Sequence, residues 1–244
     1  ALIDQATNDH RFLEVVKNDL HRSGRFLPKT DREVPEQASS VSQVNSDVWR
    51  SAGVNFLVNV NPKGGVIQVD VGDAFTKTVR GSRQFQYLSD ERGQRRLAHQ
   101  VADFIYEVIL GVPGSFNSKV AYVSRHNRGF ALIVADADGA YPQTILESNE
   151  PILSPTWSPD GRKLAYASLE GKRNQIIVQD LYSGHRNVVI QEAGINSAPT
   201  WSPDGTRLAF TLSRDGNPEI YSANADGSGL RRLTNHPGID TEPA

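Results

Sequence analysis

The stretch that decides the fold reads Thr-Trp-Ser-Pro-Asp-Gly, and it occurs twice, at residues 156–161 and 200–205. The residues after it repeat as well, because Lys-Leu-Ala-Tyr at 163–166 returns as Arg-Leu-Ala-Phe at 207–210. A degenerate copy, Lys-Val-Ala-Tyr, begins at Lys119, 44 residues before Lys163. Repeats of about 40–45 residues with short strands are typical of four-stranded propeller blades. The sequence therefore predicts an all-β propeller over 119–244, of which about two to three blades are present.

The hexapeptide has the residues of a tight hairpin turn. Pro159 fixes φ for the first central position of a type I turn, Asp160 suits the second, and Gly161 accepts the left-handed backbone that follows. The second copy has Pro203, Asp204 and Gly205 in the same order. We therefore interpret these residues as structural parts of a repeated blade.

A tryptophan, Trp157 or Trp201, precedes each turn and is the largest apolar side chain of its repeat. We expect it to pack one blade against the next. Between the turns, β-branched or aromatic runs at 164–166, 175–178 and 187–190 predict strands. The spacing leaves no room for helices within a blade.

Residues 1–111 follow another pattern, which predicts an α/β domain. Apolar residues at helical spacing indicate a first helix that stops at Gly24. A short helix is expected at 47–52, and a long helix should begin with a cap at Ser89 and end at Gly111.

Three strands of one sheet are predicted between these helices, at 54–60, 66–71 and 76–79. The segment 30–43 is polar and without a period, so we interpret it as a surface connection. Gly, Pro and Ser cluster at 112–118, where the period changes from helical to strand, and this segment is the predicted junction with the propeller.

The charges nearly balance, with 26 Lys and Arg against 28 Asp and Glu, a net charge of −2. Such a chain has no positive field to attract nucleic acid or anionic lipid. No apolar run approaches the roughly 20 residues that cross a bilayer. Cysteine is absent, which excludes disulfides and thiol chemistry, and the lack of any methionine indicates a processed or trimmed chain. Nucleic acid and a membrane span are therefore not expected.

The motifs of common enzymes are missing. The chain contains no G-x-S-x-G, G-x-x-x-x-G-K-[ST], G-x-G-x-x-G or H-E-x-x-H. Its six histidines lack ligand spacing and are interpreted as surface or helix residues. Asp160 and Asp204 could ligate a cation, but their place in a turn favours a structural role. The sequence therefore favours a binding protein with no catalytic residue, metal or cofactor.

Longer segments resemble a known family. LSPTWSPDGRKLAYAS at 153–168, SAPTWSPDGTRLAFTLSRDGNPEIY at 197–221 and ADGSGLRRLTNHPGIDTEP at 225–243 are similar to the propeller repeats of the TolB family of the Tol-Pal envelope system. Upstream, NDLHRSGRFLP at 18–28 and DVWRSAGVNFLVNV at 47–60 are similar to the α/β domain of that family. The resemblance covers nearly the whole chain.

The resemblance implies a non-enzymatic periplasmic scaffold. In the family an α/β domain precedes a six-bladed propeller, which receives the peptidoglycan-associated lipoprotein Pal and supports outer-membrane integrity and cell division. It also implies that TolA binds an N-terminal segment not present in this chain. We expect the chain to be truncated at both ends, with the first strand of the α/β domain missing.

A partner-binding site is expected where the repeat brings equivalent residues together. Ser154, Ala198 and Glu242 lie 44 residues apart, each just before a proline, and should form an arc at one mouth of the central channel. Asn196 and Thr241 should lie beside it. The resemblance implies that Pal docks at this mouth, where Ala198, Thr241 and Glu242 match contact positions. Ile195 stands where the family often has histidine.

Two other functions stay open. The first is the propeller of a prolyl-oligopeptidase-type serine peptidase that lacks its hydrolase domain, although such enzymes are not expected to have this α/β domain before the blades. The second is a sugar- or metal-binding propeller that uses Asp160 and Asp204.

Overall fold

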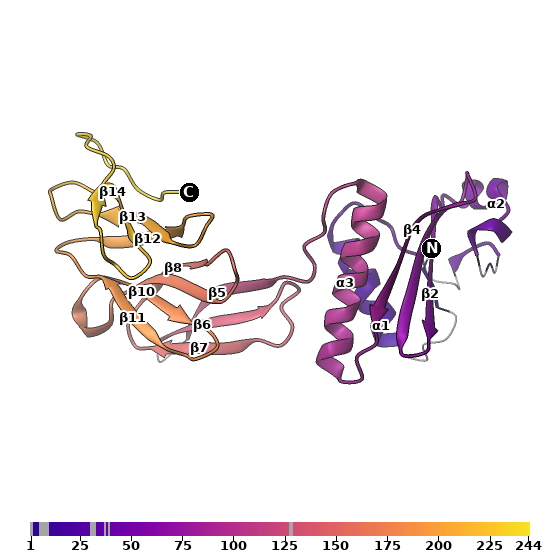
Figure 1. Ribbon diagram of the computed structural model, residues 1–244, viewed down its shortest axis with the longest axis horizontal. Coiled ribbons are helices and arrows are strands. Elements are labelled where there is room, and N and C mark those ends of the chain that lie inside the picture. Colours follow the sequence, from indigo (N-terminus) through magenta and orange to yellow (C-terminus); the bar gives the residue numbers. More distant parts are fainter. Residues whose placement is uncertain (1, 5–9, 30–32, 37, 39, 127–128) are drawn as a thin grey trace. The chain divides into compact units, whose positions relative to one another are not determined.

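The chain folds into two compact units, residues 1–118 and 119–244 (Figure 1). The computed structural model describes residues 2–4, 10–29, 33–36, 38, 40–126 and 129–244. An α/β architecture followed by antiparallel β-sheets is the predicted fold class, and the structure confirms it. No helix in the described part of the chain has the length and apolarity to cross a bilayer.

A four-stranded sheet forms the centre of the first unit. Its strands are β1 (Leu2–Asp4), β2 (Phe56–Lys63), β3 (Val66–Asp73) and β4 (Thr78–Gln86), in that order across the sheet. β2, β3 and β4 are antiparallel neighbours, and β1 pairs parallel to β2. The first strand of this domain was expected to be missing, and β1 was not predicted, because three residues are too few to show a period.

The α-helices in the described part of this unit are α1 (His10–Arg22), α2 (Ser46–Ser51) and α3 (Glu91–Leu110). α1 and α3 pack against each other beside the sheet (Figure 1). Asp90, and not Ser89, caps α3, because the Asp90 carboxylate accepts the Gly93 N–H at 2.8 Å. Gly111 ends the helix as predicted, with a left-handed φ of 74°.

The main core of the unit lies between the sheet and these two helices. The buried side chains alternate along β3 and recur every three or four residues along α3, as a half-buried strand and an amphipathic helix require. They include Ile67, Val69, Val71, Leu97, Val101, Phe104 and Ile105. The apolar stripe of α3 is thus the face that packs on the sheet.

A second core surrounds Trp49 of α2, which is fully buried. Ala38 and Val41 contribute to it, so this part of the segment 30–43 is not the surface connection that the sequence predicted. A short 3-10 helix, η2 (Val41–Gln43), places Val41 against Gly72, where an added Cβ would collide with the valine. Because the segment is mostly polar, its sequence gives no sign that Ala38 and Val41 are buried.

The predicted junction is fastened to α3 by one carboxylate. Asp103 accepts the backbone N–H groups of Phe116 at 2.7 Å and Asn117 at 3.1 Å. Burial raises the pKa of Asp103, and these two hydrogen bonds oppose that effect. The Phe116 ring meets the Tyr106 ring edge to face at 5.6 Å.

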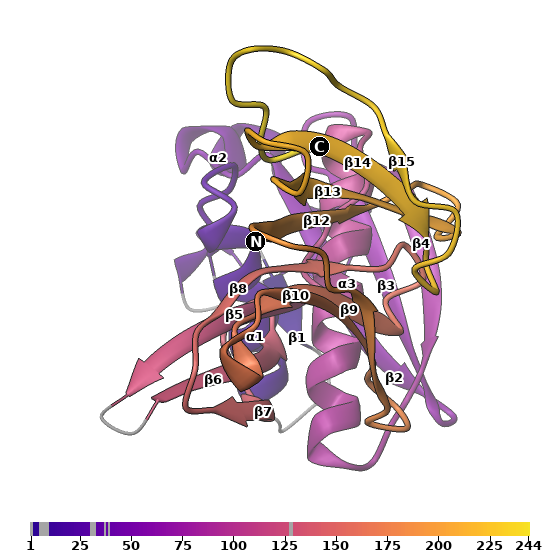
Figure 2. The same ribbon diagram turned by 90° about the vertical axis from the view of Figure 1, so that its left-hand side faces the viewer.

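The described residues of the second unit form three antiparallel sheets. They are formed by β5 (Lys119–His126), β6 (Gly129–Asp136) and β7 (Gln143–Ser148); by β8 (Ile152–Trp157), β9 (Lys163–Ser168), β10 (Gln175–Asp180) and β11 (Arg186–Ile190); and by β12 (Asn196–Trp201), β13 (Arg207–Leu212), β14 (Glu219–Asn224) and β15 (Arg231–Arg232). Figure 2 shows β12, β13 and β14 side by side. β5 begins 44 residues before β9, so the two strands are equivalent in the repeat. The first sheet therefore has no counterpart of β8 among the described residues.

Separate apolar cores join successive sheets. Leu132 of the first sheet packs with Ile152, Leu164 and Tyr166 of the second. Residues of the second sheet, including Ile176, pack with others of the third that include Phe210, Leu212 and Tyr221. This face-to-face stacking is how propeller blades bury their surfaces.

Candidate partner-binding site

The repeated hexapeptide forms the hairpin turns between β8 and β9 and between β12 and β13. In the first copy the Gly161 N–H donates to the Ser158 carbonyl at 2.9 Å, and Gly161 has φ of 67°. The Ser158 hydroxyl accepts the Lys163 N–H at 2.9 Å. The second copy repeats this geometry, with Gly205 N–H to Ser202 O at 2.9 Å and φ of 71°. Pro159 and Pro203 precede the aspartates, so the sequence dictates the turn.

The carboxylates of the two turn aspartates accept hydrogen bonds from residues of the same turn. Asp160 accepts the Ser158 hydroxyl at 2.6 Å and the Arg162 N–H at 3.0 Å. Asp204 accepts the Ser202 hydroxyl at 2.6 Å, and this bond, with those from Thr206, lowers the pKa of Asp204 to about 2. Both carboxylates therefore stabilise their turns. This role does not favour the cation-binding alternative.

Trp157 and Trp201 lie next to the cores between sheets. Each is half-buried. Trp157 packs against the core between the first and second sheets, and Trp201 against the core between the second and third. This placement supports the expectation that each tryptophan packs one blade against the next.

The inner edge of the second and third sheets is formed by β8 and β12. Each is an edge strand of its sheet, and the two strands lie side by side. The pairing register shifts between Leu153 and Thr156 in β8, and between Ser197 and Thr200 in β12. These irregularities bend the strands at equivalent positions of the repeat.

Three residues at equivalent positions of the repeat, in β8, in β12 and after β15, have the same unusual backbone conformation. Ser154 has φ of 49°, Ala198 of 48° and Glu242 of 57°. A residue with a Cβ has a cost of roughly 1–2 kcal/mol in this left-handed region, and each of the three precedes a proline. Non-glycine residues persist in such conformations only where the surrounding structure holds them, and they concentrate at functional sites.

The predicted arc is accessible at most of its positions. Ser154, Thr241 and Glu242 are exposed, and Ala198 is half-buried. The Glu242 N–H donates to the buried Thr211 hydroxyl at 3.3 Å, which ties this residue to β13. The Glu242 carboxylate is thus on the surface while its backbone is anchored.

Asn196 departs from the predicted role. It is fully buried, and its amide donates to the Glu192 carbonyl at 2.8 Å while accepting the Glu192 N–H at 2.9 Å. Its polar atoms are therefore used inside the loop before β12. Asn196 therefore holds the start of β12 in place through these hydrogen bonds. A direct contact with a partner is not expected.

Glu219 is a residue of this region that no sequence motif indicated. It is fully buried at the start of β14. Its carboxylate accepts the Thr234 hydroxyl at 2.5 Å, the His236 N–H at 2.8 Å and the Arg232 guanidinium at 2.9 Å. The Thr234 hydroxyl is the largest cause of a pKa lowered to about 2. Glu219 thus organises residues 232–236, which precede Thr241 in the chain.

Family models match both units of the chain. The TolB amino-terminal domain matches residues 3–78, and the TolB beta propeller domain matches residues 106–244. The chain belongs to the TolB family. The α/β domain before the blades, which distinguishes TolB proteins from the peptidase alternative, is therefore matched by its own family model.

Relatives and a solved structure agree with this assignment. The Tol-Pal system protein TolB of Bordetella pertussis is 42% identical over 256 residues, which cover 100% of this chain and 57% of the relative. That of Thioalkalivibrio sulfidiphilus is 46% identical over 157 residues, covering 61% of this chain and 36% of the relative. The crystal structure of TolB from Acinetobacter baumannii matches with a TM-score of 0.84 at 35% identity, covering 98% of this chain and 61% of that protein. The chain spans about half the length of its curated relatives.

Proposed function

We propose that this chain is part of a non-enzymatic periplasmic scaffold of the Tol-Pal system, which docks Pal at the inner edge of the propeller and supports outer-membrane integrity and cell division. Membership of the TolB family supports the system. The docking site is inferred from the left-handed backbone conformation that Ser154, Ala198 and Glu242 share.

The shared backbone conformation of Ser154, Ala198 and Glu242 is the observation that carries this proposal. A repeated bend presents equivalent groups at fixed spacing, so little conformational entropy is lost when a partner binds. The exposed Glu242 carboxylate can accept hydrogen bonds from the partner's N–H groups, and such charge-assisted bonds are the strong ones. The site is therefore suited to a loop with free donors.

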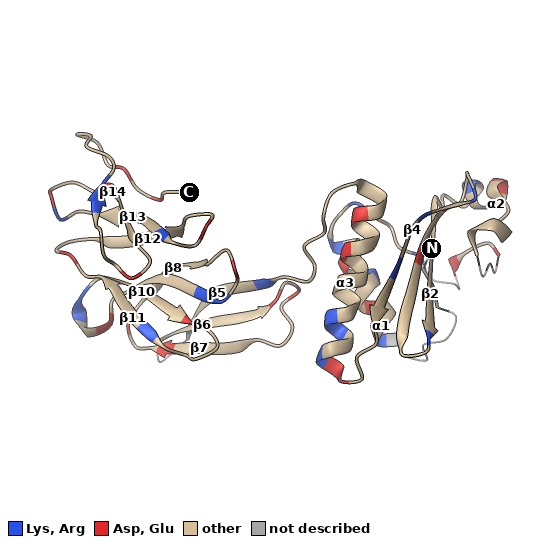
Figure 3. Ribbon diagram, viewed as in Figure 1, with Lys and Arg blue, Asp and Glu red and all other residues tan. Residues whose placement is uncertain are grey.

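The charge distribution favours a local contact over long-range attraction. Basic and acidic residues are interspersed through both units in the described part of the chain (Figure 3). With a net charge of −2, the protein has little overall field for steering a partner. Affinity should therefore depend on individual groups such as Glu242.

Charge reversal at Glu242 tests the proposal. In the natural gene product, Glu242→Lys should weaken Pal binding by about 2–5 kcal/mol, because it removes an acceptor and places a cation against the partner's donors. Isothermal titration measures the loss, and Glu147→Lys at the exposed face of β7 is the matched control. Wild-type affinity in the Glu242 variant, with an intact circular-dichroism spectrum, would refute the site.

TolA is the second proposed partner. The family resemblance assigns its contact to a segment that precedes residue 1, and this assignment stays a prediction. Co-precipitation of TolA with the natural gene product, with and without that segment, is the test.

A further inference from the structure

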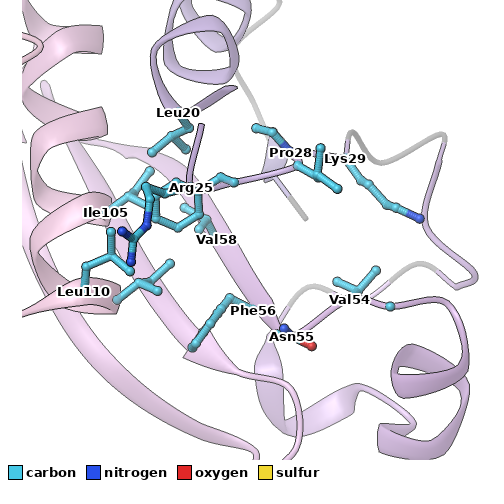
Figure 4. A pocket seen from close by; sticks show the side chains of 14 residues that line it. Leu20, Arg25, Pro28, Lys29, Val54, Asn55, Phe56, Val58, Ile105 and Leu110 are labelled. Carbon is cyan, nitrogen blue, oxygen red and sulfur yellow. The ribbon is translucent and has the colours of Figure 1, made fainter. Parts of the chain in front are cut away.

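The first unit has a hollow that the Pal-binding proposal does not use. It lies between the end of α1, the start of β2 and the end of α3, and is lined from residues 20–29, 53–58 and 105–110 (Figure 4). Its volume of about 390 Å³ falls within the roughly 300–1,000 Å³ of small-molecule pockets. This size suits a small ligand better than a folded partner.

The walls of this pocket are apolar. Leu20, Val58 and Ile105 are buried core residues that present a side to the hollow, and Phe26 and Phe56 are half-buried there. Water beside such walls forfeits hydrogen bonds, so a ligand with an apolar body gains free energy when it displaces the water. The pocket therefore favours a ligand with a hydrocarbon chain.

The charged groups of the pocket are cationic, and the amide of Asn55 also lines it. Arg25 and Lys29 line it, and no Asp or Glu does so among the described residues. Figure 4 shows the Arg25 side chain directed toward Ile105 and Leu110, inside the pocket. Within the described part of the chain, the Arg25 guanidinium has no hydrogen-bond or ion-pair partner. A guanidinium beside apolar walls is suited to bidentate binding of a carboxylate.

Lys29 has a different role at the rim. Its ammonium donates to the Ala52 carbonyl at 3.1 Å, which leaves two N–H donors. Glu33 lies in the adjoining hollow and pairs with Lys17 at 3.8 Å. Lys29 thus adds positive potential to the entrance, while Arg25 is the group positioned to contact a ligand.

We infer that this pocket binds an aliphatic monocarboxylate, with the carboxylate on Arg25 and the chain along Phe26, Phe56 and Ile105. The inference goes beyond the proposed scaffold function and does not depend on it, because Pal plays no part in the binding. Each added methylene should strengthen binding about fourfold until the pocket is full.

Titration calorimetry with hexanoate, octanoate and decanoate below their micelle concentrations tests this with the natural gene product. Affinity should rise with chain length, and 1-decanol should bind at least about tenfold more weakly than decanoate, because it lacks the charge. A chain-length series without a trend, or equal affinity for the alcohol, would overturn the inference.

Variants locate the site. Arg25→Gln should weaken decanoate binding about tenfold and Lys29→Gln by less, whereas Arg11→Gln, at a side chain that is 82% exposed outside the pocket, should leave it unchanged. Leu110→Trp, at the half-buried end of α3, should fill the hollow and abolish binding. Photocross-linking of a diazirine-bearing decanoate should label peptides that contain 20–29, 53–58 or 105–110. Labelling elsewhere, or equal loss in the Arg11 and Arg25 variants, contradicts the assignment.

Discussion

Single residues at the inner edge store backbone strain. Ala198 is held at φ of 48° by the bulge in β12, although nothing about alanine favours that conformation. The same conformation at Ser154 and Glu242 shows that the repeat imposes it. The proposed docking site takes this recurring strain as preorganisation of a binding surface.

Ala198→Gly should therefore raise the free energy of unfolding by about 0.5–1 kcal/mol, since glycine adopts this backbone without the Cβ penalty. Pal binding should weaken several-fold because the edge becomes less rigid. Urea unfolding and calorimetry measure the two effects. Ala121→Gly, in the regular strand β5, is the control and should lower stability. A large loss of stability at Ala198 would contradict the strain argument.

Trp201 tests the packing between blades. Trp201→Ala should lower stability by about 2–4 kcal/mol, near the lower end for a large aromatic, because the side chain is half-buried against the core between the second and third sheets. Thermal unfolding measures the change, and Tyr182→Ala, at a side chain that is 79% exposed, should have little effect. An unchanged melting temperature with lost Pal binding would make Trp201 a ligand platform instead.

At the scale of elements, the turns and repeated strands could be predicted from the sequence, because Pro159, Asp160 and Gly161 each have a local preference that the fold obeys. Other elements had no local signal. Most of β4 is exposed, so Thr78–Gln86 shows little alternation, and only its first part was predicted. Ala38 and Val41 are isolated anchors in a polar segment, and their burial depends on Trp49 of another element.

The third sheet also depends on a buried charge. The pKa of Glu219 lies below its usual value, so the folded state binds its proton less tightly than the unfolded chain. Its stabilising contribution should be complete above about pH 4.5 and lost as the pH falls to about 2. The urea midpoint of the wild type should therefore fall more steeply over this range than that of Glu219→Gln. Identical slopes would show that the carboxylate is not the cause.

At the scale of the whole molecule, the family and the order of the two units could be predicted, because the 44-residue period and the upstream α/β pattern are both distinctive. The candidate site was only partly predictable. Spacing identified Ser154, Ala198 and Glu242 as equivalent, but not their shared φ, which depends on strand pairing. Nor could spacing show that Asn196 would be buried or that Arg25 would enter a pocket, since both depend on contacts distant in sequence.

Hydrogen exchange of the natural gene product, with and without Pal, tests the central claim most directly. If Pal docks at the inner edge, amide protection should increase around Ser154, Ala198 and Glu242, while the turns at 158–161 and 202–205 should change little. Protection confined to other strands or to the first unit, with the three edge positions unchanged, would contradict the account.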